Sequence, residues 1–153
     1  MGQQQLILLV LATVIVGLAT VVGIRAFSEN SLKSNADALV QDAIRIAADA
    51  QAWKLKPQAM GGQQAGGAKT TLANYTGIDF AVLGYPTNAA NAYVNTNGTC
   101  TIVGAEGGAT IDCTSAGGTG AYANLATANA VTVEVTGITD EDIETTNVTI
   151  GAY

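Results

Sequence analysis

The N-terminal part of the chain is apolar on every side of a helix. Residues 6–24 contain only Leu, Ile, Val, Ala, Gly and two Thr, and residues 1–24 carry no charged side chain. Because a helix rises about 1.5 Å per residue, roughly 20 apolar residues cross the ~30 Å hydrocarbon core of a bilayer. A cleaved secretory signal would need a basic start and a shorter apolar stretch, so we expect the segment to be retained. The pattern predicts a membrane-spanning helix over residues 1–24.

Helical periodicity continues beyond this run as an amphipathic pattern. Residues 25–56 contain no Gly and no Pro. Apolar residues recur every three or four positions, at Leu32, Ala36, Leu39, Ala43, Ile46, Ala50 and Trp53, and the stripe is widened by Val40, Ile44 and Ala47. Pro57 and the Gly61–Gly62 pair predict the stop. We therefore predict one continuous helix from near residue 2 to about residue 56.

The rest of the chain changes to short segments of β-forming residues between turn residues. Residues 57–69 are Gly-rich and are predicted to be a linker, and residues 70–153 are predicted to be a β-rich domain. The predicted strands are Thr71–Tyr75, Ile78–Leu83, Ala92–Asn95, Thr99–Val103, Thr110–Thr114, Val131–Thr136 and Asn147–Gly151. Aromatic residues are few, so we expect the amphipathic part of the helix, with Trp53 as an anchor, to complete the core. The predicted fold is α+β, with the long helix packed on an antiparallel sheet.

The two cysteines are placed to face each other in a hairpin. Cys100 and Cys113 flank β-forming residues, with the turn expected at Glu106–Gly108. We predict a disulfide that closes a loop of 14 residues and contributes ~3 kcal/mol. A redox-active pair would favour the closer C-x-x-C spacing. A disulfide also predicts that this domain lies outside the cytoplasm.

Charge and composition exclude several function classes. All six basic residues precede residue 70, and the last 84 residues hold eight acids and no base. An acidic domain of this kind cannot neutralise phosphates, so no nucleic-acid binding is expected. The chain has no His, which removes the commonest general base and metal ligand. We therefore predict a protein that is not an enzyme, with no catalytic residues and no cofactor.

Residues 139–144 concentrate four carboxylates. Oxygen ligands of this kind suit Ca²⁺, which makes Asp140, Asp142 and Glu144 weak candidate metal ligands. The spacing lacks the Gly-punctuated pattern of a calcium loop. The favoured interpretation is a solvated turn or short helical start, with Thr139 as its cap and Asp142 completing a capping box.

Three N-x-S/T sequons begin at Asn74, Asn97 and Asn147 and are possible glycosylation sites. In a chain rich in Thr and Asn, several such sequons arise by chance. The Asn97–Gly98 pair favours a tight turn.

A helix that is apolar in its first half and amphipathic in its second, followed by a β-rich domain, resembles the type IV pilins and pseudopilins. The resemblance implies that residues 1–24 anchor the subunit in the cytoplasmic membrane and later form the core of a homopolymeric filament. The residues expected in that assembly helix are Gln3, Gln4, Gln5, Leu6, Leu9, Leu11, Val16, Gly17, Val21 and Gly23. The implied partners are other copies of the chain, the inner-membrane pilus assembly machinery and, where a leader is cleaved, a prepilin peptidase.

The match to the family's N-terminal motif is partial. Gln5 stands where the family usually has Glu, and a neutral amide cannot neutralise the amine of a neighbouring subunit. Met1 fits the family's first residue, whereas Gly2–Gln3 is similar to the cleavage junction of archaeal-type pilins. Val22 replaces a common Pro, and Gly17 and Gly23 can weaken the helix instead, each by ~1 kcal/mol.

The direction of insertion and the function each leave alternatives open. Basic residues follow the apolar run and none precedes it, which opposes the positive-inside rule. Either a basic leader has been removed before Met1 or a dedicated machinery overrides the rule. The expected function is a structural subunit of a cell-surface filament. The alternatives are a pseudopilin of a type II secretion system and a monomeric, membrane-anchored binding or adhesin domain.

Overall fold

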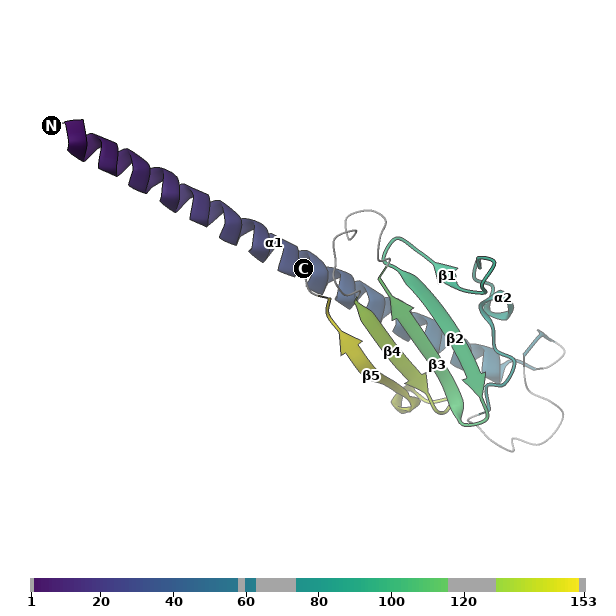
Figure 1. The fold of residues 1–153 in the computed structure, drawn as a ribbon. Helices are drawn as coiled ribbons and strands as arrows, with labels where there is room; N and C mark the ends of the chain where they lie inside the picture. Colours follow the sequence, from purple (N-terminus) through teal and green to yellow (C-terminus); the bar gives the residue numbers. More distant parts are fainter. Residues whose placement is uncertain (1, 58–59, 63–73, 116–128, 152–153) are drawn as a thin grey trace. The chain divides into compact units, whose positions relative to one another are not determined.

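The computed structural model describes residues 2–57, 60–62, 74–115 and 129–151, and it divides the chain into two units, Met1–Ser34 and Asn35–Tyr153 (Figure 1). The fold is α+β, as predicted: a long N-terminal helix and a five-stranded antiparallel sheet. Met1, most of the predicted linker and residues 71–73 of the first predicted strand lie outside the described residues.

Helix α1 (Gly2–Leu55) confirms the predicted single helix and ends one residue before the expected position. In the second unit, the predicted apolar stripe is buried at every position from Ala36 to Trp53. Ile44 is the exception among the residues that were expected to widen it, because its side chain is 42% exposed. Ile44 lies about 100° around the helix from Ala43, on the side opposite to Ile46, so its side chain points away from the buried face.

The sheet is a simple antiparallel meander with the order β1-β2-β3-β4-β5 (Figure 1). Its strands are β1 (Tyr93–Val94), β2 (Thr99–Ala105), β3 (Gly108–Thr114), β4 (Ala130–Val135) and β5 (Ile143–Thr149). The predicted strands in the regions of β1 to β4 are confirmed. The last strand begins at Ile143, four residues before its predicted start.

The predicted strand at Ile78–Leu83 is wrong, because the structure forms a short helix there, α2 (Phe80–Leu83). Asp79 precedes the helix in an extended conformation, and Gly84 ends it in the left-handed conformation, with φ 83°. The Gly84 N–H donates to the Ala81 carbonyl oxygen at 3.2 Å, and the Tyr85 N–H donates to the Phe80 carbonyl oxygen at 2.9 Å. A short apolar run does not distinguish a strand from a buried helical turn by its periodicity, and the glycine cap decides the outcome here.

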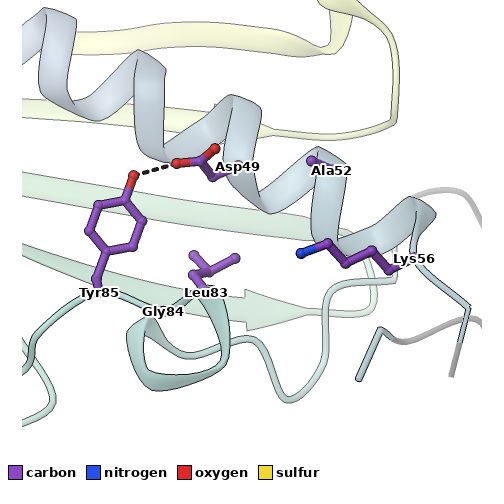
Figure 2. A pocket seen from close by; sticks show the side chains of 6 residues that line it. All are labelled: Asp49, Ala52, Lys56, Leu83, Gly84 and Tyr85. Carbon is purple, nitrogen blue, oxygen red and sulfur yellow. Dashed lines mark hydrogen bonds between the residues drawn. The ribbon is translucent and has the colours of Figure 1, made fainter. Parts of the chain in front are cut away.

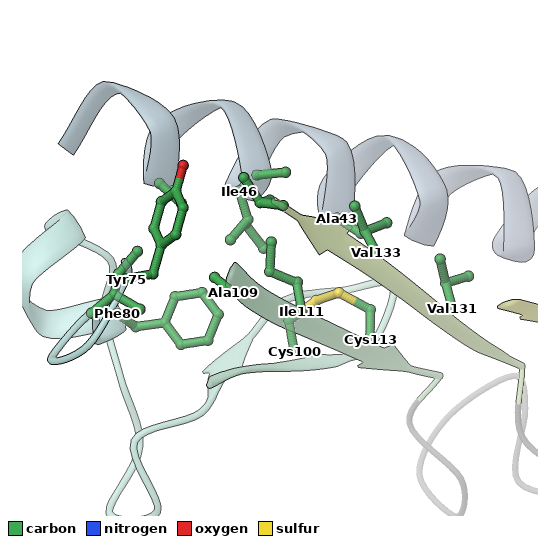
Figure 3. Packing of buried hydrophobic residues seen from close by; sticks show 14 of the residues in the cluster. Ala43, Ile46, Tyr75, Phe80, Cys100, Ala109, Ile111, Cys113, Val131 and Val133 are labelled. Atoms are coloured by element: carbon green, nitrogen blue, oxygen red, sulfur yellow. A yellow bond between two sulfur atoms is a disulfide. The ribbon is translucent and has the colours of Figure 1, made fainter. Parts of the chain in front are cut away.

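The core of the second unit lies between α1 and one face of the sheet (Figure 3). Strands β3 and β4 alternate buried and more exposed residues, so Ile111 and Val133 point toward Ala43 and Ile46 of the helix. Trp53, the predicted anchor, is buried, and its indole N–H donates to the Gly61 carbonyl oxygen at 2.9 Å. The helix therefore supplies one wall of the core, as predicted from the small number of aromatic residues in the β-rich segment.

The predicted disulfide between Cys100 and Cys113 is confirmed. The two residues are direct partners in the β2–β3 register, with their Cα atoms 4.0 Å apart, and both are fully buried. They belong to the same hydrophobic cluster as Ile111 and Val133 (Figure 3). The bond therefore cross-links two strands within the core as well as closing the hairpin.

Tyr75 joins the core to the loop that follows β4. Its ring is fully buried, and its hydroxyl donates to the Gly137 carbonyl oxygen. Burial, with the negative charge of Asp142 as a second cause, raises the pKa of Tyr75 from 10.0 to about 12. The buried phenol therefore stays protonated at pH values at which it ionises in an unfolded chain.

We expect the fold to lose stability between pH 10 and about 12 because of Tyr75. Its folded pKa is raised, so its contribution is complete below the unfolded pKa and is lost as pH rises through the folded pKa. The midpoint of thermal unfolding of the detergent-solubilised chain, measured across this range, should fall more steeply for the native chain than for Tyr75→Phe. Identical slopes in the two proteins would contradict this assignment, since the other four tyrosines are common to both.

Candidate functional site

The first unit presents a continuous apolar surface. From Leu6 to Ile24, every Leu, Ile and Val side chain is between 50% and 68% exposed. Soluble proteins rarely leave a patch of this extent in water. Among the described residues, α1 is the one helix long and apolar enough to cross a membrane by length and composition. This surface, residues 6–24, is the candidate functional site and is called the apolar segment below.

The polar side chains within the apolar segment are satisfied by the helix itself. The Thr13 hydroxyl donates to the Val10 carbonyl oxygen at 2.8 Å, and the Thr20 hydroxyl donates to the Gly17 carbonyl oxygen at 2.8 Å. A hydroxyl bonded in this way needs no water or outside partner. The segment is therefore suited to lipid or to the apolar surface of another helix.

All of the predicted assembly residues lie on α1 and are exposed. A Cβ added to Gly17 or Gly23 would meet no atom within 4 Å, so nothing packs against these glycines in the single chain. Small residues on an apolar helix allow a second helix to approach closely. Packing within the described chain therefore gives no reason for a glycine at these two positions, whereas contact with another helix would.

The acidic segment forms a capped turn, as the favoured interpretation predicts. Residues Asp140–Asp142 form a 3-10 helix, and Thr139 and Asp142 make the predicted capping box. The Asp142 carboxylate accepts hydrogen bonds from the Thr139 hydroxyl at 2.6 Å and from the Thr139 N–H at 2.9 Å. These bonds lower the pKa of Asp142. Its carboxylate is therefore engaged in the cap rather than turned toward a common centre.

The structure describes the side chains of two of the weak metal candidates, Asp142 in the capping box and Glu144 in the sheet. Glu144 lies on β5 and is the direct partner of Glu134 on β4. The side chain of Asp140 lies outside the described residues. Within the part of the chain that the structure describes, no group of three or more His, Cys, Asp or Glu side chains is placed to hold a metal ion.

Replacing Glu144 by Lys is expected to stabilise the domain by ~0.5–1 kcal/mol. Like charges directly opposite each other on neighbouring strands are destabilising, and the change turns the Glu134–Glu144 pair into an attractive one. Denaturant unfolding at low and high salt measures the effect, which should shrink as salt rises. Glu141→Lys makes the same charge change at an exposed position outside the strands, and an equal gain there would attribute the effect to net charge alone.

The three sequons differ in their surroundings. Asn147 is exposed on β5, and its Oδ1 accepts from the Thr149 hydroxyl at 3.5 Å. Asn74 is half-buried, and its Oδ1 accepts from the Thr76 N–H at 3.0 Å. The Nδ2 of Asn97, the atom that a glycan would join, donates to Asp42 at 2.9 Å. A glycan at Asn97 would break that bond, whereas Asn147 is open to solvent.

Sequence reasoning missed a shallow pocket of about 200 Å³ on the second unit (Figure 2). It is lined by Asp49, Ala52, Lys56, Leu83, Gly84 and Tyr85. The Tyr85 hydroxyl donates to the Asp49 carboxylate, and the Arg45 guanidinium lies 5.5 Å from the Tyr85 ring centroid. Burial is the main cause that raises the pKa of Tyr85. No sequence signal marks this pocket, because its lining combines the end of α1 and Lys56 with residues 83–85, which are distant in the sequence.

A second missed feature is a buried group of polar side chains, named here the asparagine network. Asn129 is fully buried, and its Nδ2 donates to Asn35 Oδ1 at 2.8 Å. Asn35 Nδ2 donates to the Asn97 carbonyl oxygen at 3.0 Å, and the Gly151 N–H donates to Asn129 Oδ1 at 2.7 Å. The network ties the helix to the turn before β2, to the start of β4 and to the end of the described chain. Asn35 is a polar residue beside the apolar stripe, and its position there is the sequence feature that could have indicated a buried polar network.

Comparisons with protein-family models, with curated proteins and with solved structures gave no match.

Proposed function

We propose that this chain is a structural subunit of an extracellular type IV pilus-like filament. The observation that carries the proposal is the apolar segment, which is exposed throughout and belongs to the same helix whose second half forms a wall of the domain core. A membrane anchor alone requires only the first of these properties. A subunit that must position a folded domain on a helical core requires both.

In the proposed mechanism, the apolar segment is held in the cytoplasmic membrane before assembly. It then leaves the bilayer and packs against the same segments of other copies. The transfer has a small free-energy cost, because apolar side chains exchange lipid for other apolar side chains. Gln3, Gln4 and Gln5 would make hydrogen bonds between subunits, since an amide left unsatisfied in a dry bundle is costly. Gly17 and Gly23 would let neighbouring helices approach closely.

The second unit supports a location outside the cytoplasm. Its disulfide is typical of oxidising compartments. Its β-rich part carries acidic residues and no base, which favours a water-facing outer surface that stays soluble at high local concentration. In the proposed filament, this unit faces water around the helical core.

The first experiment is electron microscopy of material sheared from the cell surface, with the chain identified by intact mass in the same fraction. Long thin fibres that contain this chain and have a dense helical centre are the expected result. Two other results would overturn the filament proposal. Short periplasmic assemblies would point to a pseudopilin, and a detergent-extracted monomer alone would point to an anchored binding domain.

A further inference from the structure

The turn between β1 and β2 contains a chemically labile dipeptide, Asn97–Gly98. In an Asn–Gly sequence, the backbone nitrogen of the glycine can attack the side-chain amide carbon of the asparagine. The new C–N bond closes a five-membered succinimide, and the amide nitrogen leaves as ammonia. Water then opens the ring to aspartate or isoaspartate. Glycine makes this reaction fast, because it has no side chain to hinder the attack.

Packing requires the glycine at this position. Gly98 is buried, and a Cβ placed on it would lie 2.2 Å from the Thr114 carbonyl oxygen and 2.9 Å from Leu39 Cδ2. Because the first of these atoms belongs to the backbone, the overlap cannot be relieved by moving a side chain. The fold therefore retains a dipeptide that is labile in an unstructured chain.

Hydrogen bonds hold both of the nitrogen atoms that take part in the reaction. The attacking nitrogen, the Gly98 N, donates to Asn95 Oδ1 at 2.8 Å. The leaving nitrogen, Asn97 Nδ2, donates to Asp42 Oδ2 at 2.9 Å. Asp42 Oδ2 also accepts from Asn95 Nδ2 at 2.6 Å, so one carboxylate on α1 fixes both asparagine side chains. Ring closure requires these bonds to break.

We propose that Asn97 is a conformation-gated modification site. While the turn is closed, Asp42 and Asn95 keep the side-chain amide intact. When the turn opens, Gly98 attacks Asn97, ammonia is released, and aspartate or isoaspartate forms.

The product cannot return to the native contact. An aspartate at position 97 replaces the amide donor by a carboxylate that faces Asp42, and two carboxylates at hydrogen-bond distance repel each other. An isoaspartate also lengthens the backbone by one carbon within a turn that the Asn95 N–H closes on the Gly98 carbonyl oxygen at 2.9 Å. A modified residue 97 therefore shows that the turn has opened at some earlier time. This inference does not depend on the proposed filament function.

The test compares deamidation rates of the full-length, detergent-solubilised chain at mildly alkaline pH, with peptide mapping by mass spectrometry. The native chain should retain the Asn97 amide, and the same chain in concentrated urea with reductant should lose it rapidly. Asp42→Ala should deamidate about tenfold faster than the native chain or more, because the leaving amide is released and the turn opens more often. Asp37→Ala is the matched control, because it removes an exposed carboxylate from the same helix and should leave the rate unchanged.

Three results would overturn the proposal. The first is a native chain that deamidates at Asn97 as fast as the chain in urea. The second is an Asp42→Ala chain that deamidates more slowly than the native one, which would make Asp42 a catalyst of the reaction. The third is an Asp42→Ala chain with an unchanged rate. Because Asp42→Ala can unfold the domain, Asp42→Asn is measured beside it. That variant keeps an acceptor oxygen and should deamidate at a rate between those of the native and alanine chains.

Discussion

Replacing Val16 by Asp abolishes filaments and leaves the second unit folded, if the apolar segment forms the filament core. The Val16 side chain is 62% exposed near the centre of the segment. A carboxylate at the centre of a membrane helix costs about 2.5–3.5 kcal/mol on insertion scales. In a bundle of identical helices, the same cost recurs in every subunit. The number of filaments in the fraction sheared from a fixed mass of cells, counted by electron microscopy, is therefore expected to fall to zero.

The matched control is Val103→Asp, which makes the same substitution at an equally exposed valine, 63% exposed, on β2 of the second unit. Filaments should persist in that variant. The amount of each variant in the membrane fraction is measured in parallel, because a subunit that fails to insert also fails to assemble. Normal filaments from Val16→Asp would contradict the role given to the apolar segment. Loss of filaments from both variants would show that the assay responds to any added charge.

Replacing Asn129 by Ala is expected to destabilise the second unit by roughly 2–5 kcal/mol. The change removes the donor that Asn35 Oδ1 accepts from and the acceptor that the Gly151 N–H donates to, at a fully buried position. Each buried polar group left without its bond costs about 1–3 kcal/mol, and the lost side chain leaves a small void. Since total stabilities are about 5–15 kcal/mol, this is a large fraction of the whole.

Thermal unfolding of the full-length chain in mild detergent, followed by near-ultraviolet circular dichroism, measures this loss. The midpoint should fall by on the order of 10 °C. Asn147→Ala is the matched control, because it makes the same truncation at an exposed residue of β5 and should change stability by less than ~0.5 kcal/mol. Equal shifts of the unfolding midpoint in the two variants would show that the asparagine network does not stabilise the second unit.

The long helix and the disulfide were predictable because each depends on a local or regular signal. The stripe from Ala36 to Trp53 repeats at helical spacing, and the structure buries each of its positions. Cys100 and Cys113 flank a turn sequence, and they pair across β2 and β3. The α+β class follows from these signals, because a helix with an apolar stripe needs a surface to cover.

The remaining features depend on contacts that a sequence does not display. The segment Ile78–Leu83 is apolar enough for a strand, and the left-handed Gly84 cap makes part of it helical. Ile44 has the composition of a core residue, but its angular position on the helix exposes it. Asn35 and Asn129 meet only because the fold brings together residues 94 positions apart in the sequence. Polar residues that satisfy one another in a core carry no periodic pattern.

The packing of α1 on the sheet also decides how the second unit would respond to mechanical force. Residues 36–53 form one wall of its core, and the helix lies across one face of the sheet, with the strands oblique to it in Figure 1. A pull along the helix axis would therefore load the helix–sheet contact in shear, so that many side-chain contacts must slide past one another at once. The Cys100–Cys113 bond prevents β2 and β3 from separating under the same load. This unit is expected to resist axial tension better than peeling from one end.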